Sequence, residues 1–101
     1  MTERRVRVLR RAQADLIEIQ AYVARDKPDA ADRLIGRILE RLSRLEKFPE
    51  RGAVPRDARL RKGGYRFLVE GEYLIFYRLK GREVRIYRVI QARRRYGGLL
   101  S

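Results

Sequence analysis

Arginine and tyrosine are the side chains with which this chain can do most of its chemistry. Its 101 residues include 26 lysines and arginines and six tyrosines, but no histidine and no cysteine. Without histidine the chain lacks the commonest general base at neutral pH and the commonest metal ligand. Without cysteine it lacks thiol nucleophiles, disulfides and structural zinc. We therefore expect it to act through arginine, tyrosine, carboxylates and the backbone, with neither a metal nor another cofactor.

The clearest group of such side chains lies near the C-terminus, where Arg93, Arg94 and Arg95 precede Tyr96. Guanidinium groups bind phosphate through bidentate hydrogen bonds, and a neighbouring aromatic ring can stack on a base. Arg66 is a second candidate, as a clamp for phosphate or carboxylate. We predict that these five residues bind the target. The alternative is that the arginine run is the solvated end of a strand and that Arg66 is an ordinary surface arginine.

Positive charge is concentrated in the second half of the chain. Residues 1–50 carry 12 Lys/Arg against 9 Asp/Glu, whereas residues 51–101 carry 14 against 4, a net of +10 out of +13. Such an asymmetry costs self-repulsion unless an anionic partner is bound. The charge distribution therefore predicts an acidic protein or a nucleic acid as partner.

Length and hydropathy indicate one domain spanning residues 1–101. Apolar residues make up 45% of the chain, which is enough for a single core. No apolar run approaches the ~20 residues that cross a bilayer. The first residues, Met1–Arg5, lack the apolar centre of a signal peptide. We expect a cytoplasmic protein without membrane contact.

The elements that must position these side chains begin with a short strand and two helices. Alternation over residues 4–9 predicts the strand. Apolar residues recur every three or four positions from Arg11 to Asp26, which predicts a helix with a core stripe. That stripe contains Ala12, Leu16, Ile19 and Val23, with Tyr22 beside them. Pro28 suits the first turn of a second helix, which continues its apolar face to Phe48.

Both helices carry a second stripe whose purpose the pattern leaves open. On the first helix Ile17, Ala21, Ala24 and Ala14 form a weaker apolar band, which is covered either within the fold or by a partner; we favour the internal explanation. On the second helix the arginines at 33, 37, 41 and 44 align. We favour a solvated face, with Asp29–Arg33 and Glu40–Arg44 as i,i+4 pairs, over a docking stripe.

The remaining segments predict a basic loop at residues 50–63 and three strands. The strands are Tyr65–Val69, Tyr73–Leu79 and Val84–Ile90, and each turn between them contains glycine. Aromatic and β-branched enrichment with such turns is typical of an antiparallel meander. In the last strand Val89 falls on the face opposite Val84, so either both faces are partly covered or a bulge resets the register.

The expected fold class is therefore α+β, with an N-terminal strand, a helical hairpin and a three-stranded antiparallel meander. Two helices can cover only one face of the sheet. We expect the other face to be open and basic, with arginines that depend on the register: Arg66, Arg78, Arg85 or Arg88.

Several spaced elements occur in a fixed order along the chain. They are Ala12-x-x-Asp15-Leu16-x-x-Ile19-x-x-Tyr22, Asp26-x-Pro28-x-Ala30-Ala31, Phe48-Pro49-x-x-Gly52, Tyr65-Arg66, Tyr73-x-Ile75-x-Tyr77-Arg78, Val84-x-Ile86-x-x-Val89 and Arg93-Arg94-x-Tyr96. In this combination, over residues 4–96, the chain resembles the ParE/RelE superfamily of bacterial toxins, the toxin half of type II toxin–antitoxin systems. The resemblance implies a compact sheet with a helical hairpin packed on it.

The resemblance also implies a partner, a cognate ParD-like antitoxin that is acidic in its toxin-binding segment and wraps the toxin. The two stripes on the helices are then its predicted contacts. These residues are Ile17, Ala21, Ala24, Arg33, Arg37 and Arg41.

Two activities occur within the superfamily. RelE-like members cleave mRNA in the ribosomal A site, whereas ParE-like members poison DNA gyrase. Cleavage needs groups that deprotonate a 2′-hydroxyl and stabilise the charge of the phosphorane. Many relatives have histidine shortly after the last strand, but this chain reads Ile90-Gln91-Ala92 there. Glutamine cannot act as a general acid or base at neutral pH.

We therefore predict a ParE-like toxin that inhibits DNA gyrase without being an enzyme. The long second helix and its end at Phe48-Pro49 also resemble the ParE branch. One alternative is a RelE-like, ribosome-dependent mRNA endoribonuclease that uses Tyr96 beside the three arginines. Another is a non-catalytic nucleic-acid-binding module, for which the basic charge itself is the functional element.

Overall fold

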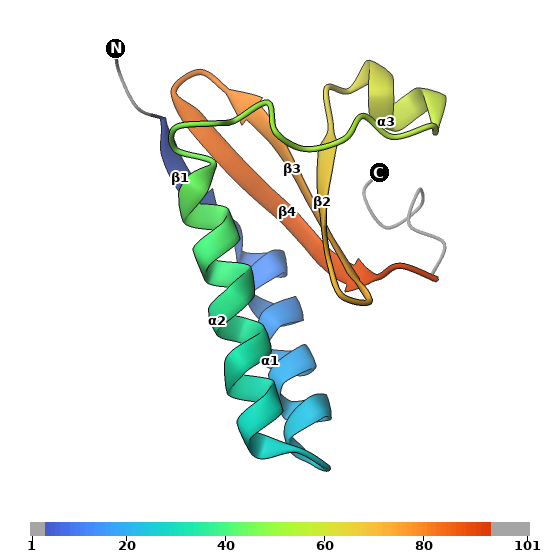
Figure 1. Ribbon diagram of the computed structural model, residues 1–101. Helices are drawn as coiled ribbons and strands as arrows, with labels where there is room; N and C mark the ends of the chain where they lie inside the picture. Colours follow the sequence, from blue (N-terminus) through green and yellow to red (C-terminus); the bar gives the residue numbers. More distant parts are fainter. Residues whose placement is uncertain (1–3, 94–101) are drawn as a thin grey trace.

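A four-stranded sheet packed against a long helical hairpin forms the body of the protein (Figure 1). The computed structural model describes residues 4–93. In chain order its elements are β1 (Arg5–Val8), α1 (Arg10–Ala24), α2 (Pro28–Arg44), α3 (Ala58–Lys62), β2 (Arg66–Glu70), β3 (Tyr73–Lys80) and β4 (Glu83–Gln91). The predicted α+β class, with its hairpin and meander, is confirmed.

The sheet has the strand order β1-β4-β3-β2. The meander β2-β3-β4 is antiparallel, and β1 adds to its outer side as a parallel partner of β4. Because β1 is short, it pairs only with residues 83–86 of β4. The chain then leaves the sheet at Leu9, whose N–H donates to the Ile86 carbonyl at 3.0 Å. Helix α1 thus begins where β1 ends and runs past the second half of β4.

Glycine closes both turns of the meander, as the sequence predicts. Gly71 has φ 57° and Gly81 has φ 60°, in the left-handed region that residues with a Cβ rarely adopt. These two positions therefore allow tight connections between the three strands.

A β-bulge in β4 explains the apolar pattern of that strand. Tyr77 pairs with Ile86 and Phe76 pairs with Arg88, so Tyr87 is an extra residue without a partner on β3. The bulge returns Val89 to the face that already carries Ile86. Both predicted explanations hold, because the bulge resets the register and both faces of the sheet are partly covered.

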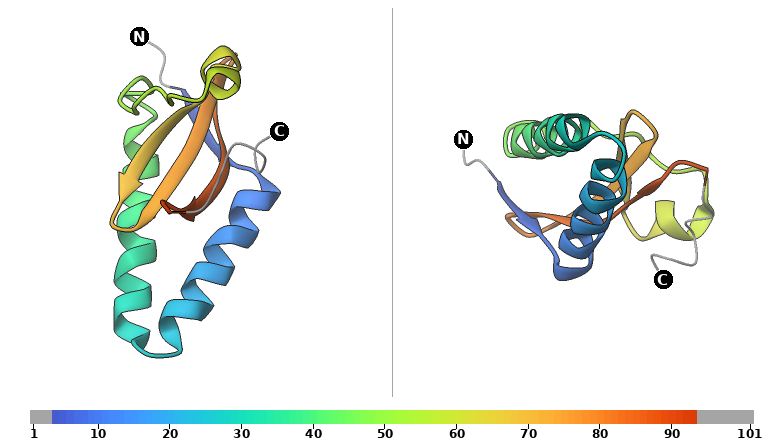
Figure 2. Two further views of the ribbon diagram at one scale, coloured as in Figure 1. Left: turned by 90° about the vertical axis from the view of Figure 1, so that its right-hand side faces the viewer. Right: turned by 90° about the horizontal axis from the view of Figure 1, so that it is seen from below.

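The main core lies between the sheet and the hairpin of α1 and α2, which extends beyond the end of the sheet (Figures 1 and 2). The buried residues are Ala12 and Ile19 from α1, Leu34, Ile38 and Leu42 from α2, Leu45 just after α2, and Leu68, Tyr73, Ile75, Tyr77, Val84, Ile86 and Val89 from the sheet. Three apolar residues expected on the inner faces of the helices are largely exposed instead. Tyr22 is 63% exposed, Leu39 is 49% exposed and Phe48 is 56% exposed.

The second face of the sheet is partly covered, which corrects the expectation that it is open, although Arg78 and Arg85 do lie on this face as expected. Leu74 and Phe76 alternate with the residues of the main core and therefore point to the opposite side. They form a smaller core with Leu60, Tyr65 and Ile90. Leu60 belongs to α3, a helix within the segment that the sequence predicted to be a loop. Exposed residues of α3 add further positive charge to this region: Arg59, Arg61 and Lys62.

Helix α3 was missed because five residues are too short to show a helical period. Its start is marked by Asp57, whose side chain accepts hydrogen bonds from the N–H groups of Arg59 and Leu60 at 2.9 and 3.1 Å. An aspartate at this position is a common N-cap. That cap and the burial of Leu60 fix the short helix over the sheet.

Tyr77 joins the sheet to the segment after α2. Its hydroxyl donates to the Pro49 carbonyl and accepts from the Gly52 N–H, both at 2.8 Å. The approach is so close that a Cβ on Gly52 would lie 2.6 Å from the tyrosine oxygen. Burial raises the pKa of the Tyr77 hydroxyl above its ordinary 10.0. The hydrogen bond with Gly52 acts in the opposite direction but has the smaller effect.

We expect Tyr77→Phe to lower the free energy of unfolding at neutral pH by about 1–3 kcal/mol, because a buried carbonyl and a buried N–H lose their partner. The stability that the raised pKa contributes is fully present below pH 10.0 and is lost as the pH rises through the folded-state value. The variant should therefore lose less stability than the wild type in alkaline solution. Urea unfolding at neutral and alkaline pH measures both effects.

Tyr22→Phe is the matched control, because its ring is largely exposed. It should change the free energy of unfolding by less than ~0.5 kcal/mol. Equal stability of Tyr77→Phe and the wild type at neutral pH would contradict the role given to the hydroxyl.

Candidate functional site

A buried ion pair between Asp15 of α1 and Arg88 of β4 lies beside the candidate site. The two residues are 5% and 6% exposed. Arg88 donates from Nε to Asp15 Oδ2 at 2.8 Å and from Nη2 to Oδ1 at 3.0 Å, which is a bidentate contact. Arg88 was expected on an open face of the sheet, and that expectation is wrong. The register pairs it with Phe76, and its guanidinium is buried against Asp15 of α1 instead of lying open to solvent.

Asp15 also compensates for the shortness of β1. Beyond Val8 the outer edge of β4 has no neighbouring strand. The Val89 N–H on that edge donates to Asp15 Oδ2 at 2.9 Å, so a helix side chain replaces the missing strand as acceptor. One carboxylate therefore satisfies a buried arginine and a buried backbone N–H.

A cavity of about 310 Å³ opens beside this pair, between α1 and the ends of β3 and β4. Its lining residues are Asp15, Glu18, Ile19, Tyr22, Tyr73, Val89, Ile90, Gln91 and Arg93. Burial raises the pKa of the Tyr73 hydroxyl, while a hydrogen bond with Gln91 lowers it. With apolar side chains, two phenol rings and charged groups in its lining, the cavity suits an amphipathic side chain of a partner.

The structure separates the predicted target-binding residues. Arg93 is exposed and lines the cavity, directly after β4. Arg66 lies at the start of β2, away from Arg93, because it pairs with Tyr77 whereas Gln91 pairs with Tyr73. Four residues of strand correspond to about 13 Å. Arg94, Arg95 and Tyr96 lie outside the described residues.

Arg66 already has partners within the fold. Its Nη1 donates to the carbonyl oxygens of Glu50 and Gly52 at 3.2 and 3.0 Å. These bonds hold the segment after α2 against β2. Its other guanidinium nitrogen atoms are the groups that can bind a partner.

The apolar band on α1 is not covered within the fold. Ile17 is 68% exposed and Ala21 is exposed, while Ala24 is half-buried. The internal explanation that we favoured for this band is therefore wrong for these residues. Ile17 offers an apolar side chain to a partner.

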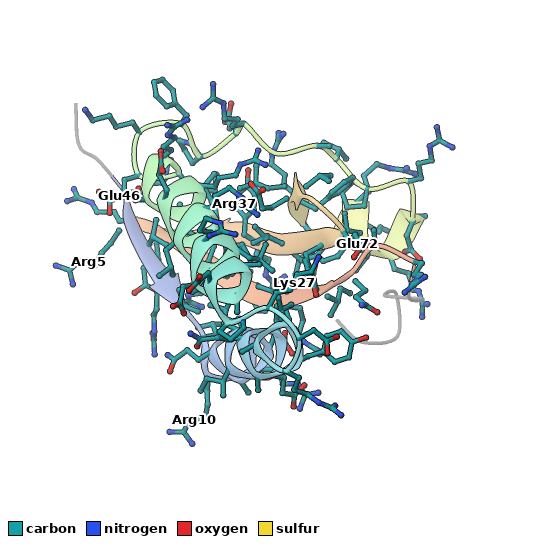
Figure 3. The ribbon with its side chains drawn as sticks, turned by 60° about the horizontal axis from the view of Figure 1, so that its bottom comes forward. Arg5, Arg10, Lys27, Arg37, Glu46 and Glu72 are labelled. Atoms are coloured by element: carbon teal, nitrogen blue, oxygen red, sulfur yellow. The ribbon has the colours of Figure 1, made fainter. Side chains whose placement is uncertain are left out.

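The arginine stripe on α2 divides into exposed and paired members. Arg33 is exposed. Arg37, on the side of α2 seen in Figure 3, donates from Nε to Glu70 Oε2 at 3.2 Å. Arg41 donates to the Val69 carbonyl and lies 3.7 Å from Glu70 Oε1. The predicted pair Arg44–Glu40 is present at 2.8 Å.

Sequence reasoning missed a stack of three side chains on the second face of the sheet. The Arg78 guanidinium lies 4.8 Å from the ring centroids of both Tyr65 and Tyr87. It donates to the Tyr87 hydroxyl at 2.9 Å and to the Gly63 carbonyl at 3.1 Å. Burial raises the pKa of the Tyr65 hydroxyl, although Arg78 lowers it. The register that brings these residues together depends on the bulge, which the sequence did not locate.

Within residues 4–93 no group of three His, Cys, Asp or Glu side chains is placed to hold a metal ion. In the same part of the chain, no helix has both the length and the apolar character needed to cross a membrane.

Comparison with known proteins identifies the family. Residues 6–96 match the family model described as the ParE toxin of the type II toxin–antitoxin system parDE. The chain belongs to the ParE toxin family. It is 34% identical over 100 residues to the protein Y4kP of Sinorhizobium fredii, a candidate toxin, and the match covers 99% of this chain and 100% of that protein.

Solved structures agree with this membership. This ParE-family toxin superposes on a chain of the chromosomal ParDE system from P. aeruginosa with a TM-score of 0.75 and 25% identity, over 88% of this chain and 96% of that one. It superposes on a chain of the toxin–antitoxin complex RelBE2 from Mycobacterium tuberculosis with a TM-score of 0.65 and 25% identity, over 88% and 98%. The predicted resemblance to the ParE/RelE superfamily is confirmed, and the protein is the toxin of a type II toxin–antitoxin pair.

The buried pair gives a stability prediction for the toxin. Asp15→Asn keeps the shape of the side chain but leaves the Arg88 charge without its counter-ion. We expect it to lower the free energy of unfolding by about 3–5 kcal/mol. The double variant Asp15→Leu/Arg88→Met should recover part of that loss, because no buried charge remains. Chemical unfolding of the three proteins measures the difference.

The exposed pair Arg44–Glu40 provides the control, since both side chains are more than half exposed. Glu40→Gln should change the free energy of unfolding by less than about 1 kcal/mol. A cost for Asp15→Asn no larger than that of Glu40→Gln would show that the buried pair does not hold α1 on the sheet.

Proposed function

We propose that this toxin acts by inhibiting DNA gyrase and does not cleave RNA. The observation that carries the proposal is chemical. Cleavage at a 2′-hydroxyl needs a proton acceptor that works at neutral pH, and the chain has no histidine. On the second face of the sheet burial raises the pKa of the Tyr65 hydroxyl, so this side chain is even less available as a phenolate base at neutral pH.

The state of Arg78 supports the same proposal. Its guanidinium stacks between two tyrosine rings and donates to Gly63 and Tyr87, so it serves the fold on that face. A group that must stabilise a developing phosphorane needs free donors aimed at the reacting phosphate. The larger TM-score for the chain of the ParDE system, 0.75 against 0.65 for that of RelBE2, also favours the ParE-like activity.

In this proposal the basic residues bind the target and transfer no proton. Arg93 at the rim of the cavity and Arg66 at the far end of β2 supply charge and planar donors. Arg94, Arg95 and Tyr96, which follow Arg93 in the chain, extend that contact. The second candidate remains a RelE-like endoribonuclease acting on mRNA in the ribosome, with Tyr96 beside the arginines; the likeness to the RelBE2 chain favours it.

A ParD-like antitoxin is the proposed partner that neutralises the toxin. Both solved neighbours come from toxin–antitoxin pairs. The exposed Ile17 and Ala21, with the half-buried Ala24, supply an apolar contact surface on α1. The contact of Arg37 and Arg41 with Glu70 supports carboxylate binding on α2, since a carboxylate already lies there. Arg33 adds an exposed positive charge, and cytoplasmic action follows from both proposed targets.

Two assays distinguish the candidate targets. We expect the toxin to inhibit gyrase supercoiling and to leave mRNA on programmed ribosomes intact. The triple variant Arg93→Ala/Arg94→Ala/Arg95→Ala should lose most of the inhibition, because each lost charge-assisted contact costs about 1–3 kcal/mol. Lysine at the same three positions keeps the charge but lacks the planar guanidinium group, so this variant should lose less of the gyrase inhibition than the alanine variant. A thermal melt of each variant checks that the fold is intact.

Ribosome-dependent cleavage that disappears in Tyr96→Phe would overturn the gyrase proposal in favour of the endoribonuclease. Full inhibition by the triple alanine variant would show that the arginine run is only a solvated end of the chain.

Binding of the antitoxin gives a separate prediction. The double variant Ile17→Asp/Ala21→Glu should weaken the complex with the cognate antitoxin by at least tenfold, because carboxylates replace apolar contacts and repel an acidic partner. Titration calorimetry with the purified pair measures the affinity. Val54→Asp, which changes another exposed apolar residue, is the control. Equal effects of the two changes would remove the α1 band from the antitoxin interface.

A further inference from the structure

A second concave, basic surface lies around the C-terminal end of α2, the end marked by Glu46 in Figure 3. Two cavities of about 500 and 340 Å³ meet there and share Arg51. The first is lined by Arg4, Lys47, Phe48, Pro49, Glu50 and Arg51, and the second by Arg41, Arg44, Leu45, Arg51 and Leu68. We call these lining residues the α2-end surface. It lies away from the Arg93 cavity, because Pro49 contacts Tyr77 in the middle of β3, whereas Tyr73 at the start of β3 lines that cavity.

The α2-end surface carries five basic residues and one acidic residue, Glu50. Arg41 and Arg44 already have carboxylate partners in Glu70 and Glu40. In the part of the chain that the structure describes, no ion pair involves Arg4, Lys47 or Arg51. These three cations are therefore available to an anion from outside.

An aromatic ring lies among these cations. The side chain of Phe48 is 56% exposed, which is unusual for a large apolar residue that the core could bury. The Arg51 guanidinium lies 5.6 Å from its ring centroid. The backbone on both sides is fixed, since the Phe48 N–H donates to the Arg44 carbonyl at 3.0 Å and the next carbonyl, that of Pro49, accepts from Tyr77. The ring is thus presented to solvent by an ordered segment.

We propose that the α2-end surface binds single-stranded nucleic acid. A base stacks on Phe48, and Arg4, Lys47 and Arg51 bind the phosphates on either side. Positive side chains along a groove, with an exposed aromatic ring between them, are the features by which proteins bind single strands without reading their sequence. This binding goes beyond gyrase inhibition and requires neither gyrase nor the ribosome.

An acidic peptide is the other anion that this charge could attract, but the surface fits it less well. Carboxylates need only the cations, and an exposed phenylalanine adds nothing to their binding. A base, in contrast, gains from an aromatic plane, and the neighbouring guanidinium can extend the stack. The combination of ring and cations therefore favours a nucleic acid.

The test measures binding of a fluorescein-labelled oligothymidine to the purified toxin by anisotropy over a series of salt concentrations. Because the chain has a net charge of +13, charge-matched variants are required. Arg4→Gln/Lys47→Gln/Arg51→Gln removes two arginines and one lysine from the α2-end surface. Arg10→Gln/Arg25→Gln/Lys27→Gln removes the same types from the hairpin, where Figure 3 labels Arg10 and Lys27.

We expect the first triple variant to reduce the slope of log affinity against log salt by about 2, since each single-strand phosphate contributes about 0.7. The second triple variant should leave the slope unchanged. Equal reductions in both variants would overturn the proposal, because the binding would then depend only on net charge.

Phe48 is tested separately from charge. The chain contains no tryptophan, so Phe48→Trp introduces a single fluorophore at the proposed stacking position. Its emission should be quenched by oligothymidine, while affinity is retained. Phe48→Ala should weaken binding about 5- to 150-fold, which corresponds to about 1–3 kcal/mol for one stacked base. Val54→Ala, at another exposed apolar residue, should have no effect.

Three results would contradict the proposal. The first is emission of the Phe48→Trp variant that does not change at saturating oligothymidine. The second is a duplex of the same length bound as tightly as the single strand. The third is a glutamate-rich peptide that binds more tightly than the oligonucleotide at the same salt, which would assign the surface to an acidic protein.

Discussion

The carboxylate of Asp15 is the group on which the arrangement of helix and sheet depends. It accepts two hydrogen bonds from the buried Arg88 and one from the Val89 N–H. Removing it would take the counter-ion from a buried guanidinium and the acceptor from a buried backbone N–H, and both losses are costly in the interior. Arg88 and Val89 follow Asp15 in the chain by 73 and 74 positions. The contact therefore fixes α1 against the half of β4 that does not pair with β1. The cavity that Arg93 lines lies beside this same contact.

The other edge of the sheet is protected in a similar way. On β2 the backbone of Phe67 pairs with Ala53, and the Val69 carbonyl accepts from Arg41. A free strand edge invites pairing with another chain, and charged side chains are a common defence against it. Helix side chains therefore complete the hydrogen bonding at both edges: Asp15 beside β4 and Arg41 beside β2. Neither contact was visible in the sequence, because each depends on which helix lies over which strand.

Much of the fold could be predicted because its signals are local. The period of α1, the proline at the start of α2 and the glycines between the strands each fix one element from neighbouring residues. The rest depends on contacts between distant residues. The face of Arg88 follows from the bulge at Tyr87, and the short α3 is stabilised by Leu60 in the second core. For the site, Arg93 could be placed at the end of β4, but its cavity and the exposure of Tyr22 required the structure.

The side chains available to this toxin also decide which solution condition controls its binding. With neither histidine nor cysteine, no side-chain type in the chain has an ordinary pKa near neutrality. Burial raises the pKa values of Tyr65, Tyr73 and Tyr77 further from that range. The side-chain charge is therefore nearly constant over physiological pH. Screening by salt still acts on exposed arginines and lysines, whose contacts with anionic partners weaken as ions accumulate. The binding of such partners should thus respond strongly to ionic strength and weakly to pH.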